Sequence, residues 1–317
     1  MPGEFELIAR HLAALTDQRA DVVLGVGDDA ALLRPPPGHD LVVTVDTLVA
    51  GVHFFDDCPP AALGHKALAV NLSDLAAMGA QPAWALLALT LPAADDAWLA
   101  QFASGFAALA NQFKVALVGG DTCRGPLAVS VTALGSVPRG HALRRSGARP
   151  GDGVYLSGEI GAAGLAVLAR QGAINLPTAL AAHAARRLDY PQPQVALGLG
   201  LRRLASAAID VSDGLLADLE HICNASGVGA RLDLACVPVP DRALTVTSIE
   251  SLIGFGDDYE LCFTVPPQHV QALAAVACNA GCAITRIGQI EAAPGLWLVD
   301  AAGEARPAPR GGHDHFL

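Results

Sequence analysis

The stretch KALAVNLSDLAAMGA, residues 66–80, decides the fold because it combines an apolar helix with polar side chains that a core does not otherwise need. Nearly every helical position in it is apolar, which predicts a buried helix over residues 61–79. Asn71 and Asp74 are three positions apart and share a face. A buried carboxylate costs several kcal/mol unless it has a partner, which is Lys66, a backbone amide or a divalent cation. The cation is favoured because Lys66 lies about two helical turns away.

Helix and strand patterns alternate on both sides of this helix. The predicted strands are 41–45, 83–91, 115–119, 127–137, 154–158, 208–212, 230–234, 259–265, 284–290 and 296–299, and the other predicted helices are 4–16, 94–113, 162–171, 176–187, 194–207, 215–225 and 267–280. This mixed order predicts an α+β or α/β architecture. The stretch 138–153 is rich in Pro, Gly and Arg and predicts a boundary. The length of 317 residues then predicts two domains, 1–140 and 150–317.

Charge and composition exclude several classes of protein. The chain has 31 acidic residues against 20 Lys plus Arg, a net charge of −11, so nucleic acid is not a predicted partner. The longest uncharged stretch, 75–94, contains Pro82 and Pro92, which argue against a membrane-spanning helix. Glu4 and Glu6 interrupt the N-terminal region where a signal peptide would lie. Seven cysteines without zinc-site spacing predict reduced thiols and a cytoplasmic protein.

Aspartates recur beside glycine, serine or threonine near the ends of predicted strands in the first half of the chain. Strand alternation places Thr44 and Asp46 on one face. Asp28 and Asp29 lie in a glycine-flanked loop, and Asp121 follows a predicted strand and two glycines. A structural interpretation remains open for each, since a strand can end in a polar turn and Gly-Asp pairs form turns.

The second half repeats this pattern. Asp210 and Ser212 share a predicted strand face, and Asp213 with Gly214 opens a helix. The structural alternative is that Ser212 or Asp213 is the N-cap of this helix. Taken together, hard oxygen donors on rigid elements beside glycine are typical of Mg²⁺ bound with a polyphosphate. Four or more such carboxylates indicate several ions.

The usual nucleotide-binding motifs are absent from the sequence. There is no P-loop and no kinase glycine-rich loop with its lysine motif. The run GEIGAAG at 158–164 is a weak phosphate-loop signal or a strand-to-helix turn. The aspartate pattern favours an enzyme that transfers a phosphoryl group from Mg-ATP to a small anionic acceptor.

Several segments in order carry a resemblance to a known family: GDDAALL, TVDTLVAGVHF, KALAVNLSDLAAMGAQPAW, VGGDTCRGPL, DVSDGLLADL, GDDYELCF and the terminal DHF. They resemble the thiamine-monophosphate kinases of the aminoimidazole-ribonucleotide synthetase-like superfamily, over about Glu4 to Phe316. The resemblance implies the reaction of ATP with thiamine monophosphate, giving thiamine diphosphate and ADP by direct in-line transfer. It also implies an N-terminal ferredoxin-like domain for ATP, Mg²⁺ and dimerisation and a C-terminal α/β sandwich domain completing the nucleotide and substrate site. The expected assembly is a homodimer in which two N-terminal sheets close a barrel.

The resemblance also implies roles for particular residues. The metal-ligand positions are Asp29, Thr44, Val45 through its backbone, Asp46, Asp74, Asp121, Asp210 and Asp213. The nucleotide positions are Gly120, Asp121, Arg145 and Ser212, and the substrate positions are His53, Asp257 and His313, which replaces the family's usual aromatic residue. We predict that Asp46, Asp74, Asp121 and Asp210 are the catalytic members of this set.

Two other functions remain open. One is another ATPase of the superfamily, but the first 57 residues lack the cysteine of a selenophosphate-synthetase-like protein, and the sequence ends GGHDHFL without the cysteine-bearing tail of a hydrogenase-maturation-like protein. The other is a non-catalytic scaffold that binds metal or nucleotide. The spread of candidate ligands over both halves disfavours it, because metal buffers use compact local loops.

Overall fold

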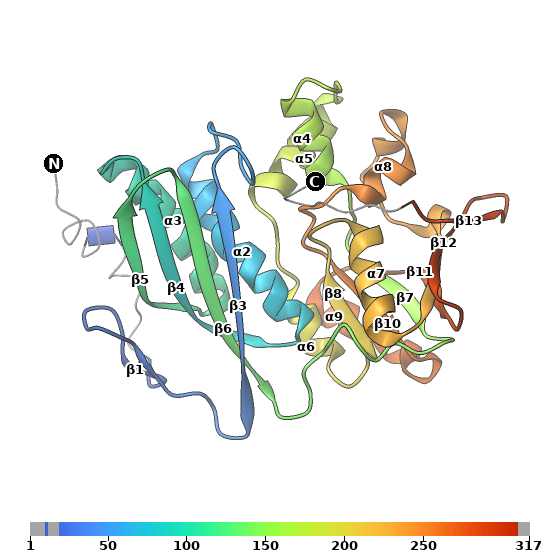
Figure 1. Cartoon of the computed structure of the whole chain (residues 1–317), viewed down its shortest axis with the longest axis horizontal. Coiled ribbons are helices and arrows are strands. Elements are labelled where there is room, and N and C mark those ends of the chain that lie inside the picture. Colours follow the sequence, from blue (N-terminus) through green and yellow to red (C-terminus); the bar gives the residue numbers. More distant parts are fainter. Residues whose placement is uncertain (1–9, 12–18, 310–317) are drawn as a thin grey trace. The chain divides into compact units, whose positions relative to one another are not determined.

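The computed structural model describes residues 10–11 and 19–309, so His313 and all of the predicted helix 4–16 except residues 10–11 lie outside the described residues. The chain folds into two compact units (Figure 1). Unit 1 contains Met1–Leu75 and Ala80–Gly140, and unit 2 contains Ala76–Gly79 and His141–Leu317.

Unit 1 is a four-stranded sheet with two helices on one face (Figure 1). The strand order is β3-β6-β4-β5, in which β4 and β5 run parallel and the other neighbours antiparallel. The elements are β3 (His39–Val49), α2 (Pro60–Ala77), β4 (Gln81–Leu91), α3 (Asp96–Phe113), β5 (Ala116–Arg124) and β6 (Ala128–Pro138), preceded by the short pair β1 (Val22–Leu24) and β2 (Leu32–Leu33). This is the α+β arrangement that the sequence predicts.

The buried helix α2 packs closely on α3. A Cβ atom added at Gly64 would lie 2.1 Å from the carbonyl oxygen of Phe102, and one added at Gly105 would lie 1.9 Å from that of Ala61. Glycine at these positions therefore lets the two helix backbones touch. This contact fixes the position of α2, the helix that carries Asp74.

Unit 2 is built around a seven-stranded mixed sheet of order β13-β12-β9-β11-β7-β10-β8. Only the β12–β9 pair among these neighbours is parallel. The strands are β7 (Gly153–Ser157), β8 (Ala207–Asp210), β9 (Gly229–Asp233), β10 (Leu261–Val265), β11 (Ile284–Glu291), β12 (Gly295–Val299) and β13 (Ala305–Pro307). The helices are α4 (Ala162–Arg170), α5 (Thr178–Asp189), α6 (Val195–Leu201), α7 (Leu215–Ser226), α8 (Ile249–Gly254) and α9 (Leu273–Ala280), with the 3₁₀ turns η3 (Leu234–Cys236), η4 (Ala243–Thr245) and η5 (Pro267–Ala272).

In unit 2, four predicted elements differ from the structure. The helix 194–207 ends at Leu201, because Arg202 has a non-helical ψ of 132° and Arg203 is left-handed. The strand 208–212 ends at Asp210, and the helix 267–280 divides into η5 and α9. The strand 259–265 begins only at Leu261, since Tyr259 has a φ of 53° and cannot pair as extended backbone. Within the described residues, no helix is both long and apolar enough to cross a membrane.

Candidate functional site

The first group of predicted site residues lies where β3 faces α2 in unit 1. The hydroxyl of Thr44 donates a hydrogen bond to Oδ2 of Asp74, which joins the strand to the helix. Asp46 is two residues further along β3 and therefore projects from the same face as Thr44. Both carboxylates are only partly buried, so their oxygens remain within reach of a solvent-borne ligand.

Lys66, the alternative partner for Asp74, is almost fully buried, at 2% exposed. Its Nζ lies 3.4 Å from the backbone oxygen of His53. The imidazole Nδ1 of His53 accepts a hydrogen bond from the backbone N–H of Val49 at 3.1 Å. These contacts tie the segment after β3 to α2 and hold the His53 ring in one orientation.

Asp121 is placed differently from the sequence prediction. It lies inside β5, not after a strand, because β5 continues to Arg124. Asp121 pairs with Ala88 of β4, while its neighbour Gly120 pairs with Leu87 in the row that contains Asp46. Since successive rows project to opposite faces, Asp121 lies on the open face of the sheet, together with Val45, and not on the face of Asp46.

Two further predicted positions in unit 1, Asp29 and Gly120, are exposed. Asp29 is exposed in the loop after β1, and its backbone N–H donates to Oδ1 of Asp28 at 2.8 Å. Gly120 is exposed, and a Cβ atom there would lie 1.9 Å from the carbonyl oxygen of Leu87. The glycine at this position therefore has a steric reason within the sheet itself.

The unit 2 group lies in the turn between β8 and α7. Asp210 ends β8 and is buried, at 4% exposed. Gly214 occupies the N-cap position of α7, and neither Ser212 nor Asp213 caps the helix, which overturns that interpretation of the sequence. Instead, Oδ2 of Asp218 reaches back and accepts from the backbone N–H groups of Ser212 and Asp213, at 3.0 and 3.1 Å.

Asp218 was missed by sequence reasoning, although it lies in the first turn of a helix that begins with a glycine. Its side chain is buried, and burial, together with the nearby negative charge of Asp213, raises the pKa of the Asp218 carboxyl to about 7. The two backbone hydrogen bonds and the positive charge of Arg145, an exposed side chain, act in the opposite direction. Asp218 thus determines the shape of the turn that presents Ser212 and Asp213.

Asp218→Asn should flatten the pH dependence of stability. Because the folded pKa lies above the unfolded value, the stabilising contribution is complete below about pH 4 and is lost as pH rises through about 7. The amide oxygen of Asn can still accept both N–H bonds but does not ionise. Urea denaturation should show wild type losing about 2–3 kcal/mol more than the variant between pH 5 and pH 8. Parallel pH profiles would contradict this.

The segment Asp257–Glu260 forms a second turn beside the first. Backbone N–H groups of Asp257 and Tyr259 donate to the carbonyl oxygens of Ser212 and Val211, each at 2.9 Å. The predicted substrate residue Asp257 is half-buried in this turn. The turn thus holds Asp257 against the loop that carries Ser212 and Asp213.

Two buried carboxyl groups of this second turn bond to other segments of unit 2. Glu260 accepts from Nη2 of Arg187 and from Oγ of Ser157, both at 2.5 Å. Asp258 accepts from the backbone N–H of Gly161 at 2.8 Å, which shows that the glycine-containing run 158–164 is a strand-to-helix turn. Burial raises the pKa of both carboxyls, while the charge of Arg187 opposes the increase. Sequence reasoning did not identify this network, because its members are far apart in the chain.

The donor chemistry fits magnesium bound with a phosphate ligand. Among residues 10–11 and 19–309, no group of three or more His, Cys, Asp or Glu side chains gathers closely enough to hold a metal ion. Hard oxygen donors occur here in small groups of one or two side chains. One group is Thr44 with Asp74, and the other is Asp210 with Asp213. One or two carboxylates combined with substrate phosphates and water is how proteins usually bind Mg²⁺.

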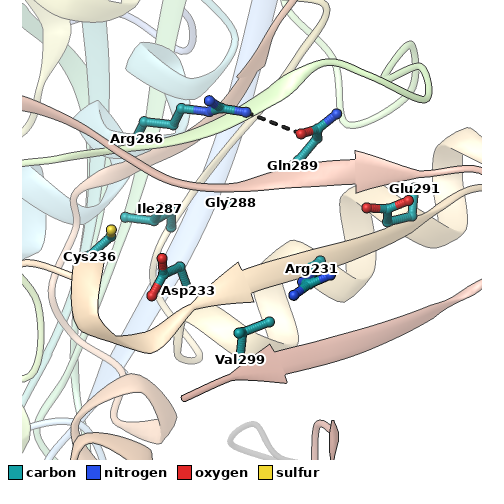
Figure 2. A pocket seen from close by; sticks show the side chains of 9 residues that line it. All are labelled: Arg231, Asp233, Cys236, Arg286, Ile287, Gly288, Gln289, Glu291 and Val299. Carbon is teal, nitrogen blue, oxygen red and sulfur yellow. Dashed lines mark hydrogen bonds between the residues drawn. The ribbon is translucent and has the colours of Figure 1, made fainter. Parts of the chain in front are cut away.

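A cavity of about 370 Å³ in unit 2 has none of these residues in its lining (Figure 2). It crosses β9, β11 and β12, and Arg286 on its edge donates to Gln289 at 3.2 Å. Arg231 and Arg286 are matched by Asp233 and Glu291, so the lining has no excess of positive charge. It contains none of the predicted site residues and is not suited to a polyphosphate.

Family models match both parts of the chain. The N-terminal domain of AIR synthase related proteins matches residues 27–137, and the C-terminal domain of the same proteins matches residues 149–300. The thiamine-monophosphate kinase of Escherichia coli K12 is 48% identical over 99% of this chain and 98% of its own length. That of Caulobacter vibrioides is 42% identical over 93% of this chain and 86% of its own.

Solved structures agree with these relatives. Thiamine-monophosphate kinase from Stenotrophomonas maltophilia has a TM-score of 0.87 and 46% identity, with 95% of this chain and 97% of that chain covered. AaThiL, complexed with AMPPCP and TMP, has a TM-score of 0.79 and 28% identity over 99% of this chain and 97% of its own. A hydrogenase maturation protein HypE in complex with ATP has a TM-score of 0.79 but 20% identity, over 98% of this chain and 95% of that chain, and so shares the fold alone.

Proposed function

Because this chain belongs to the thiamine-monophosphate kinase family, within the AIR synthase related proteins, we propose that it phosphorylates thiamine monophosphate with ATP, giving thiamine diphosphate and ADP. The observation that carries this proposal is the identity of 48% to a kinase of that name over nearly the whole chain. The AaThiL complex supports the choice of substrates, since AMPPCP is an analogue of ATP. We therefore favour a kinase over a non-catalytic scaffold.

The transfer is direct and in line. An oxygen of the thiamine monophosphate phosphate attacks the γ-phosphorus of ATP, and the bond from that phosphorus to the β–γ bridging oxygen breaks, releasing ADP. The attacking oxygen is already negatively charged, so no strong general base is needed. The protein contributes positioning and charge compensation. Arg145 is suited to bind nucleotide phosphates with charge-assisted hydrogen bonds, and the hydroxyl of Ser212 offers a further donor.

Several Mg²⁺ ions are proposed as companions of ATP. The ligand set we propose is that of the sequence analysis, with Asp74, held by Thr44, in unit 1 and Asp210 with Asp213 in unit 2. When bound, Mg²⁺ lowers the repulsion between two phosphate groups. Asp121 remains in the proposed set, but its place on the open face of the sheet makes it a poor partner for Asp46 within one protomer.

We also propose a homodimer joined through unit 1. On the open face of its sheet, β3 exposes Leu41, Val43 and Val45 to 48%, 55% and 62%. An apolar strand face of this kind is typical of a surface that another chain covers. In this proposal, unit 1 forms the dimer and binds ATP and Mg²⁺. Unit 2 completes the substrate site. None of the seven cysteines, all of which lie in the described part of the chain, forms a disulfide, which supports a reducing, cytoplasmic compartment.

A coupled assay of ADP release tests the proposed function. ADP should form only when ATP, thiamine monophosphate and Mg²⁺ are all present, and chelation by EDTA should stop the reaction until Mg²⁺ is restored. Thiamine diphosphate identified by chromatography distinguishes transfer from ATP hydrolysis. Turnover with aminoimidazole precursors but not with thiamine monophosphate would refute the proposal. Light scattering of the same preparation should give about twice the chain mass of 32.4 kDa.

A further inference from the structure

Two non-glycine residues of the second turn have left-handed backbone conformations. The φ of Asp257 is 66° and that of Tyr259 is 53°. Left-handed backbone is uncommon outside glycine, and such a conformation persists only where the surrounding structure holds it. Here the surroundings do so, because both backbone N–H groups bond to the segment at Val211 and Ser212. Strained conformations of this kind concentrate at functional sites.

Close packing prevents the turn from relaxing. A Cβ atom added at Gly256 would lie 2.1 Å from the carbonyl oxygen of Ser212. At the other end of the turn, the backbone N–H of Val211 donates to the carbonyl oxygen of Glu260 at 2.8 Å. Asp258, between the two left-handed residues, is buried at 1% exposed. The backbone of the turn is therefore held at both of its ends against the segment of Val211 and Ser212.

The side chain of Tyr259 acts on Asp257. Its ring is buried, at 7% exposed, and its hydroxyl donates to Oδ1 of Asp257 at 2.9 Å. The left-handed conformation at both positions brings these two side chains to the same side of the turn. A hydrogen bond to a carboxylate is among the stronger hydrogen bonds in proteins, so it restricts rotation of the Asp257 carboxylate.

We propose that Tyr259 is a positioning residue, which orients the Asp257 carboxylate toward the positively charged thiazolium ring of thiamine monophosphate. This inference rests on the proposed function and on the substrate role of Asp257. A carboxylate held in one orientation by a buried phenol does not have to be ordered when substrate binds, so less free energy is lost on binding. Binding of ATP involves no thiazolium and should not depend on Tyr259.

Tyr259→Phe tests this role because it removes the hydroxyl and keeps the ring. The KM for thiamine monophosphate should rise about five- to tenfold, while kcat and the KM for ATP change less than about twofold. The matched control is Tyr155→Phe, in which the tyrosine is also buried in unit 2, at 6% exposed, and stacks on Phe263. It should leave both KM values unchanged, and thermal unfolding of each variant checks the fold.

A double-mutant cycle with Asp257→Asn separates positioning from structure. If Tyr259 acts through Asp257, adding Tyr259→Phe to Asp257→Asn should raise the KM for thiamine monophosphate less than about twofold further. An unchanged KM for thiamine monophosphate in Tyr259→Phe overturns the inference. So does a loss of kcat as large as the rise in KM in a Tyr259→Phe protein that is also destabilised. Full additivity of the two substitutions in the cycle overturns it as well. The first measurement of the series is turnover of thiamine monophosphate by the wild-type protein. If there is none, the proposed function itself is refuted.

Discussion

Asp74→Asn should lower turnover by about 10²–10³-fold while the protein stays folded. The amide oxygen of Asn can accept the hydrogen bond from Thr44, so the link between β3 and α2 persists. What disappears is the negative charge, and neutral oxygens are weaker ligands for Mg²⁺. Because Asn and Asp side chains have almost the same volume, the substitution does not disturb packing of the buried helix α2. Steady-state ADP release with saturating ATP and thiamine monophosphate measures the effect.

The matched control for this charge change is Asp40→Asn. Asp40 lies on the same strand, β3, but is exposed, and its carboxylate is 3.7 Å from the guanidinium of Arg139. An exposed ion pair of this kind contributes little, so turnover should stay within about twofold of wild type. If Asp74→Asn retains normal activity at ordinary Mg²⁺ concentrations, Asp74 is not a metal ligand. Equal effects of both variants would indicate a general effect of charge.

Gly120→Ala should abolish activity through loss of structure in unit 1. The new Cβ atom would meet the carbonyl oxygen of Leu87 at 1.9 Å, and this backbone atom belongs to the neighbouring strand β4. Neither strand can move without breaking the parallel β4–β5 pair, so we expect a loss of about 3 kcal/mol or more of unfolding free energy. Thermal and urea unfolding, together with the soluble yield, measure this.

The adjacent glycine supplies the control. A Cβ atom at Gly119 would lie 3.0 Å from Cδ2 of Leu86, the end of a flexible side chain that can shift. We expect Gly119→Ala to cost less than about 1 kcal/mol. A Gly120→Ala protein with normal stability but a raised KM for ATP would show that the glycine serves the nucleotide and not the sheet.

Local patterns account for how much of unit 1 could be predicted. Helix α2 and strand β3 were predicted within a few residues, because their apolar periodicity is present in the sequence itself. Asp121 was different, because the sequence does not contain the length of β5 or its pairing with Ala88. Those depend on β4, which is about 30 residues away, and they place the side chain on the other face of the sheet.

Helix α6 shows the same limit in unit 2. The apolar pattern continues past residue 201, so the sequence predicts a longer helix than the structure contains. The end is set by tertiary contacts, since Nε of Arg202 donates at 2.5 Å to the carbonyl oxygen of Gly79. Propensity is a weak signal where such a contact competes with it.

From the sequence alone came the family, the reaction and the aspartates beside glycine and serine, because residue types and their order survive without coordinates. Only the tertiary structure decided that Asp218 reaches back to the turn at Ser212, and that the Tyr259 hydroxyl holds Asp257. The physical reason is that hydrogen bonds, burial and left-handed backbone depend on which distant segments pack together. The periodicity of the sequence does not indicate which segments these are.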